Sequence, residues 1–114
     1  MEACAAEVRA YCADVDQGDG RASACLASHR EKLSPACLPE VSALAESLLA
    51  PGEVRKIFSP DFRAELPPSC ESAAARLCPD VERSDGRMFA CLYARSQQVG
   101  AACQADAQAV VAAE

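Results

Sequence analysis

The segment CADVDQGDGRASAC, residues 12–25, decides the fold because the chain contains it twice. Sixty-six residues later, residues 78–91 read CPDVERSDGRMFAC, with the cysteines, the Asp-Val pair and the Asp-Gly-Arg tripeptide at matching positions. Two further cysteines flank each copy at the same spacing, which gives two sets of four: Cys4, Cys12, Cys25 and Cys37, then Cys70, Cys78, Cys91 and Cys103. Such an internal repeat is one supersecondary unit used twice.

Each repeat has the pattern of a helical hairpin. In the first arm, Cys4, Val8, Cys12 and Val15 follow the spacing of one helical face. The second arm continues this pattern at Ala22, Cys25, Leu26 and Leu33. The residues between the arms are rich in Asp and Gly, which is typical of a turn. Two helices joined by so short a turn lie antiparallel.

The connector between the repeats predicts further helices. One is expected from Pro39 to the stop signal Pro51-Gly52, and a second from Ser59-Pro60 to before Pro67-Pro68. We therefore expect repeat 1 at residues 1–50, a connector that packs the repeats together at 51–69, and repeat 2 at 70–114. The fold class is all-α: two tandem, disulfide-stapled antiparallel helical hairpins with connecting helices.

The connector also holds the bulkiest apolar group of the chain, which includes Phe58, Phe62 and Leu66. Two interpretations stand side by side. These residues pack the two hairpins together, or they form an exposed patch that binds a protein partner.

The eight cysteines allow 105 pairings, but hairpin geometry favours one. In an antiparallel hairpin, residues equidistant from the turn face each other, and both Cys12/Cys25 and Cys4/Cys37 are centred on the same turn. The predicted bonds are Cys4–Cys37, Cys12–Cys25, Cys70–Cys103 and Cys78–Cys91. Loops of about 14 and 34 residues closed in this way contribute about 3 and 4 kcal/mol in the chain-entropy model. A lobe this small needs such a contribution because its core is thin.

A metal site is the rival use of these thiols. Structural zinc sites present close ligand pairs, whereas this chain has no Cys-x-x-Cys. His29 follows Cys25 by one helical turn, but the second repeat has Arg95 there, so we interpret His29 as a polar residue beside the apolar stripe.

The acidic turns resemble a calcium loop only superficially. Counted from Asp14, the sixth position is Asp19 and the twelfth is Cys25, whereas a calcium loop needs Gly and Glu there. A weak cation site at the turn carboxylates stays as an alternative. Arg21 and Arg87 follow the turns, and we expect them to form structural ion pairs with the turn acids of their own repeat, Asp14 and Asp16 or Asp80 and Glu82.

Composition excludes several classes of function. The net charge of −6 argues against nucleic-acid binding, and no apolar run is long enough to cross a membrane. With one histidine and cysteines expected to be bonded, few side chains remain for acid–base or nucleophilic catalysis, so we expect neither an enzyme nor a cofactor. Thiols at this density favour an oxidising compartment, and we expect a periplasmic or secreted protein whose export signal is not in this sequence.

The motifs Cys-x7-Cys-x-Asp-Val, Asp-Gly-Arg, Cys-Leu and Leu-Ser-Pro-Ala-Cys resemble the cysteine-rich repeat family of the Golgi apparatus sialoglycoprotein. The resemblance covers residues 4–37 and 70–103, and in the second copy Val99-Gly100-Ala101-Ala102-Cys103 replaces the Leu-Ser-Pro-Ala-Cys end. Short bacterial proteins of this kind usually carry an export signal, and the abundance of Ala and Arg suggests a bacterial source. The growth-factor and selectin binding associated with the long animal array does not transfer to two repeats.

The sequence therefore predicts a small exported, disulfide-stabilised binding module with an unidentified protein partner. A periplasmic metal-handling protein that uses thiols, His29 or loop carboxylates is the alternative. A factor that exchanges its disulfides with client proteins is the third hypothesis.

Overall fold

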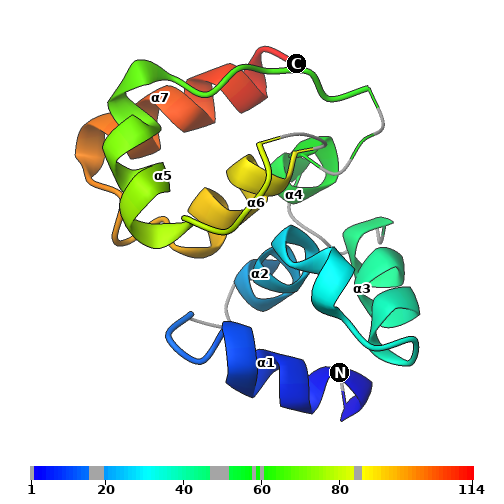
Figure 1. Ribbon diagram of the computed structural model, residues 1–114. Coiled ribbons are helices and arrows are strands. Elements are labelled where there is room, and N and C mark those ends of the chain that lie inside the picture. The colour runs from blue at the N-terminus through cyan, green and yellow to red at the C-terminus, as the bar shows by residue number, and fades with distance from the viewer. Residues whose placement is uncertain (1, 16–19, 47–51, 58, 60, 84–85) are drawn as a thin grey trace.

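Each repeat folds into three α-helices, one more than the two of the predicted hairpin. The computed structural model describes residues 2–15, 20–46, 52–57, 59, 61–83 and 86–114, which contain helices and turns but no strand (Figure 1). Repeat 1 comprises η1 (Glu2–Cys4), α1 (Ala5–Tyr11), α2 (Arg21–Ser28), η3 (Arg30–Lys32) and α3 (Cys37–Glu46). After α4 (Gly52–Ile57), repeat 2 comprises η4 (Pro68–Cys70), α5 (Glu71–Leu77), α6 (Arg87–Ala94) and α7 (Ala101–Ala112). The disulfide-stapled all-α fold is confirmed.

Two disulfides link the three helices of each repeat. The inner bond joins the end of the first helix to the second helix, with Cα–Cα distances of 6.1 Å for Cys12–Cys25 and 6.4 Å for Cys78–Cys91. The outer bond joins the start of the first helix to the third helix, at 4.8 Å for Cys4–Cys37 and 4.7 Å for Cys70–Cys103. These are the pairs of the nested arrangement, but the outer bond ends on a third helix and not on the second arm of a hairpin.

The start of α3 shows how local sequence sets a helix boundary. The Ser34 side-chain oxygen accepts a hydrogen bond from the Cys37 backbone N–H at 3.2 Å, as an N-cap residue does. The Ser34 backbone N–H in turn donates to the Glu7 carboxylate of α1 at 2.9 Å, and this hydrogen bond lowers the pKa of Glu7. α1 and α3 are thus held together by a polar contact as well as by the outer disulfide.

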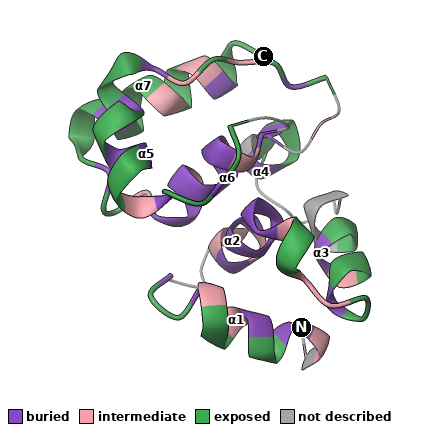
Figure 2. Ribbon diagram, viewed as in Figure 1, coloured by how far each residue is buried: buried purple, intermediate pink, exposed green. Residues whose placement is uncertain are grey.

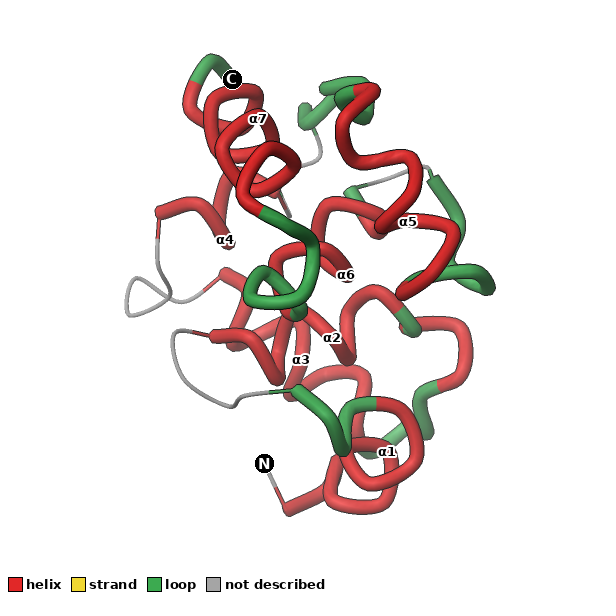
Figure 3. Tube along the Cα trace, turned by 90° about the vertical axis from the view of Figure 1, so that its left-hand side faces the viewer, coloured by secondary structure: helices red, strands yellow, loops and turns green. Residues whose placement is uncertain are grey.

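The second helices of the two repeats, α2 and α6, pack against each other at the centre of the molecule (Figures 1 and 3). Figure 2 shows both as mainly buried, whereas α7 exposes much of its surface. Small side chains occupy both helices and let them approach closely: Ala24, Cys25 and Ser28 on α2, and Ala90, Cys91 and Ala94 on α6. The radius of gyration is 12.9 Å, close to the roughly 13 Å of a single domain of this length.

The connector differs from the prediction. The helix expected from Ser59 does not form: residue 61 lies in a turn, and residues 62–67 have no regular secondary structure. Phe62 inserts edge-on against Phe89 of α6 at 5.0 Å between ring centroids, and the Arg63 N–H donates to the Glu114 carboxylate at 3.1 Å. These contacts hold the segment away from helical geometry. A helix forms earlier instead, since Gly52 begins α4, which contacts α3, α6 and α7.

Gly86 should be the least replaceable of the glycines whose surroundings are described. It precedes α6 with φ of +72°, and a Cβ there would collide with the backbone carbonyl oxygen of Ile57 at the end of α4. Gly100 also has a positive φ, +89°, but has open space around it. We expect Gly100→Ala to lower the free energy of unfolding by about 1–3 kcal/mol through backbone strain. Gly86→Ala should cost about 2 kcal/mol more because it adds the collision.

Urea denaturation of both variants measures the difference. Equal losses would show that α4 does not pack on the start of α6 as described.

Candidate functional site

Arg95 joins the two repeats through buried polar contacts. It is 8% exposed, and its guanidinium donates to the Tyr11 carbonyl oxygen at 3.3 Å and to the Asp14 carboxylate at 3.0 Å, both in repeat 1. The same guanidinium lies 3.8 Å from Cys25 Sγ and from Cys91 Sγ, one in each inner disulfide. Arg95 therefore lies at the meeting point of both disulfides and both central helices.

His29 occupies the equivalent position in repeat 1. It is 6% exposed, and its ring stacks on Tyr11 with 5.3 Å between ring centroids. Its Nδ1 atom is buried and has no hydrogen-bond partner. Burial lowers the pKa of His29, and the carboxylate of Asp80 opposes this effect. No pattern in the sequence indicated that His29 lies at the contact between repeats.

Further ion pairs across this contact neutralise the acidic turns. Lys32 bonds Asp80 at 2.8 Å, which lowers the pKa of Asp80, and Arg87 bonds Glu31 at 2.8 Å and Glu82 at 3.3 Å. The expected pair of Arg87 with Glu82 is present. Two of the other turn acids bind cations of the opposite repeat, Asp14 through Arg95 and Asp80 through Lys32. The pair expected between Arg21 and its own turn acids stays a prediction. Asp16 and Asp19 lie outside the described residues.

The cysteines offer no thiolate as a metal ligand in this state, because all eight are bonded in disulfides. Within the described residues, no three His, Cys, Asp or Glu side chains are grouped to hold a metal ion. The disulfide sulfurs are also buried, since each cysteine is at most 2% exposed.

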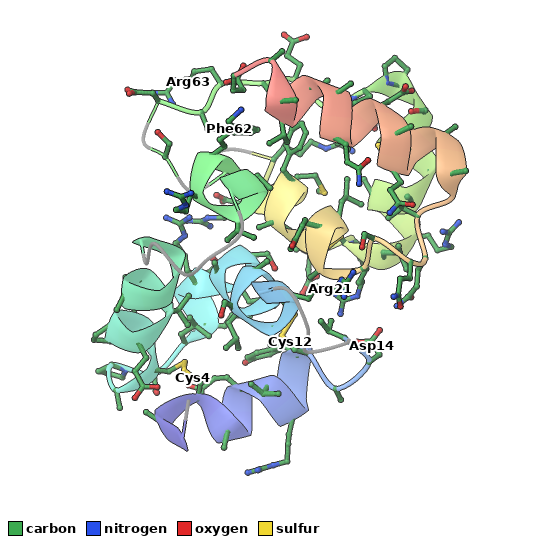
Figure 4. All side chains as sticks on the ribbon, turned by 180° about the vertical axis from the view of Figure 1, so that it is seen from behind. Cys4, Cys12, Asp14, Arg21, Phe62 and Arg63 are labelled. Atoms are coloured by element: carbon green, nitrogen blue, oxygen red, sulfur yellow. A yellow bond between two sulfur atoms is a disulfide. The ribbon has the colours of Figure 1, made fainter. Side chains whose placement is uncertain are left out.

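The residues considered as a partner-binding patch separate in the structure. Phe62 is 5% exposed and belongs to the core that joins repeat 1 to α6 (Figure 4). Leu66 is half-buried and packs against the core of repeat 2, and Phe58 lies outside the described residues. Phe62 and Leu66 thus occupy packing positions.

A cavity of about 260 Å³ lies between α6 and α7 and reaches Ile57 at the end of α4 and Arg21 at the start of α2. Apolar side chains form about half of its wall: Ile57, Phe89, Leu92, Val99, Ala107 and Val111. Polar groups are contributed by Arg21, Tyr93, Ser96, Gln104 and Gln108. A concave site that combines apolar side chains with polar groups can hold a small molecule.

A difference between the repeats accounts for the cavity. In repeat 1, α3 packs against α2, and Val41 is buried there. In repeat 2 the equivalent of Val41 is Ala107, and α7 makes its main contacts with η4 and α4 instead of α6. A comparison of the two copies beyond their cysteines shows this smaller residue, so the signal was present in the sequence and was missed.

The comparisons with known proteins agree with the repeat architecture. Golgi apparatus protein 1 from Cricetulus griseus is 28% identical over 91 residues, and the protein of that name from Mus musculus is 26% identical over 91 residues. The chain is similar to Golgi apparatus protein 1. The match covers 80% of this chain but only 7% of each Golgi apparatus protein 1. No family model matches the chain, and no solved structure matches it significantly.

The disulfides fit a protein of the secretory type, because such bonds persist in oxidising compartments. Among the described helices, none is both long and apolar enough to cross a membrane.

Acid should destabilise the protein through His29 before the carboxylates titrate. The folded-state pKa of His29 lies below the unfolded value of about 6.5, so its contribution is complete above that pH and decreases as pH falls towards the folded pKa. The charged groups nearest to the ring are Glu31, Lys32, Asp80 and Arg95. We expect the urea midpoint of the wild type to fall between about pH 7 and pH 5. In His29→Phe, which keeps the ring on Tyr11, the midpoint should change less over this interval.

An equal pH dependence in both proteins would contradict the burial of a neutral His29. A loss of stability that begins only near pH 4 would come from carboxylates, which titrate in that range. The interval from pH 7 to pH 5 therefore reports on His29.

Proposed function

We propose that this protein is an exported, disulfide-stabilised binding module that holds a small apolar molecule in the cavity between α6 and α7. The observation that carries the proposal is the cavity itself. A water molecule takes up about 30 Å³ in the liquid, so a volume of 260 Å³ corresponds to about nine waters. An apolar ligand of that size would gain by leaving water for this interior.

The wall of the cavity is fixed at both ends, as a preformed site requires. The Cys70–Cys103 bond anchors the start of α7. At the other end, Lys56 donates to the carbonyl oxygen of Ala112 at 3.2 Å, and the Arg63 N–H donates to Glu114. A ligand would therefore meet a site that needs little ordering on binding.

The described part of the surface favours a small ligand over a protein partner. Among the described residues, Leu38 is the one large apolar side chain that is exposed, at 41%. A stable protein interface normally has a cluster of such residues at its centre. The burial of all the disulfides argues against exchange with client proteins, which requires an accessible sulfur. The bonded state of the cysteines argues against metal handling through thiols.

The proposed compartment is the periplasm or the exterior of the cell. Its support is the number of disulfides, since removal of one from a small secreted domain typically costs about 2–5 kcal/mol. A reducing compartment would deprive each repeat of that contribution.

Fluorescence titration with the neutral probe N-phenyl-1-naphthylamine tests the cavity. Wild-type protein should bind the probe with an increase in fluorescence. Ala107→Phe, which fills the cavity from α7, should weaken binding about tenfold or more. Ala109→Phe is the matched control, because Ala109 is exposed on the same helix, and its affinity should stay within about twofold of wild type.

Urea denaturation of both variants verifies that they are folded. No binding by the wild type, or equal weakening by both substitutions, would overturn the proposal.

A further inference from the structure

We infer that His29 makes the contact between the repeats sensitive to pH: the contact is closed while the imidazole is neutral and opens locally when the ring gains a proton. The ring lies at the end of α2, is 6% exposed and stacks on Tyr11 at 5.3 Å between ring centroids. Its buried Nδ1 atom has no hydrogen-bond partner. In the charged ring both nitrogens carry N–H donors, so Nδ1 would be a buried donor without an acceptor.

The described carboxylates that face the ring already have cations as partners. Asp80 accepts a hydrogen bond from Lys32 at 2.8 Å, and Glu31 binds Arg87 at 2.8 Å. Lys32 itself is one of the cations that face the ring. A proton on His29 would therefore add a positive charge to a cluster in which these carboxylates are already paired.

The equivalent position of repeat 2 shows what a charged side chain needs at this contact. Arg95 follows His29 by 66 residues, as Asp80 follows Asp14. Arg95 carries a permanent charge, faces the His29 ring and donates to Asp14 of the opposite repeat at 3.0 Å. The corresponding partner of a protonated His29 is Asp80, but Lys32 occupies that carboxylate. The contact therefore accommodates His29 better as a neutral ring than as a cation.

The covalent structure allows this contact to open while each repeat stays folded. The four disulfides account for all eight cysteines and lie within the repeats, so none joins α2 to α6 (Figure 1). Small side chains such as Ala24 and Ala90 are buried on these helices and contribute less apolar burial than larger ones. The contact is closed above about pH 6.5 and opens as the pH falls towards the lower pKa that His29 has in the folded protein.

Hydrogen–deuterium exchange read by mass spectrometry, without denaturant, tests the inference at about pH 7 and pH 5. The rates are compared with the intrinsic exchange rate at each pH. In the wild type, amides of α2 and α6 should lose protection about fivefold or more at the lower pH. Amides of α7, which the Cys70–Cys103 bond holds to repeat 2, should keep their protection. In His29→Phe, which retains an aromatic ring on Tyr11, protection should change less than about twofold.

Lys32→Met separates this charge mechanism from a simple weakening of the contact. The substitution removes an ion pair between the repeats, but it also frees Asp80 as a partner for the charged ring. We therefore expect a higher pKa of His29, measured by NMR on the only histidine of the chain, and a smaller loss of protection in acid than in the wild type. Lys56→Met is the matched control, because Lys56 is an exposed lysine that donates to Ala112, and it should keep the wild-type response.

The inference is overturned if the wild type shows no response to acid, if His29→Phe responds equally, or if Lys32→Met responds more strongly than the wild type. A parallel loss of protection in α7 would also overturn it, because the whole protein would then be unfolding. Urea denaturation at neutral pH verifies that the variants are folded. If His29→Phe does not fold, the comparison of Lys32→Met with Lys56→Met still decides.

Discussion

Two nested disulfides in each repeat are the constraint on which the rest of the structure depends. The inner bond fixes the first helix to the second, and the outer bond fixes it to the third. Because these helices are held covalently, each repeat is stable with a core made largely of alanine and cysteine. Six of the seven α-helices found in the described residues have ten residues or fewer, lengths at which isolated helices are marginal in water. Covalent bonds therefore do here what a large apolar core does elsewhere.

The bonded repeats meet through α2 and α6, and their divergence at this contact is informative. Arg95 reaches across to Asp14, whereas its counterpart His29 remains buried and stacked, and Lys32 supplies the cation for Asp80. The two repeats share one arrangement of helices, but the second repeat differs from the first in its third helix. Its third helix carries Ala107 where the first carries Val41, and a cavity takes the place of close packing. We regard the first repeat as mainly structural and the second as the one that binds.

Much of the frame could be predicted from the spacing of the cysteines. The repeat, the helical class and the nested pairs follow from residues at fixed intervals around an Asp-Gly turn. The third helix in the second repeat carries no comparable signal, because Ala101–Ala112 is mostly alanine and its polar residues Gln104, Asp106 and Gln108 leave no clear apolar face. The helix predicted from Ser59 was wrong for another reason: Phe62 packs against Phe89 of the second repeat, a contact distant in sequence that local helix signals do not show. The position of His29 depends on a contact between repeats, which spacing within one repeat does not reveal. The cavity could have been anticipated, because Ala107 replaces Val41 in the second copy.

The most direct test of this account is disulfide mapping of the unreduced protein by tryptic digestion at mildly acidic pH and mass spectrometry. A basic residue lies between every two successive cysteines (Arg9, Arg21, Arg30, Arg63, Arg76, Arg87 and Arg95), so each cysteine falls on its own peptide. The account predicts four linked pairs: Cys4–Cys37, Cys12–Cys25, Cys70–Cys103 and Cys78–Cys91. Any bond between the repeats, or free thiols that carry a metal, would contradict it.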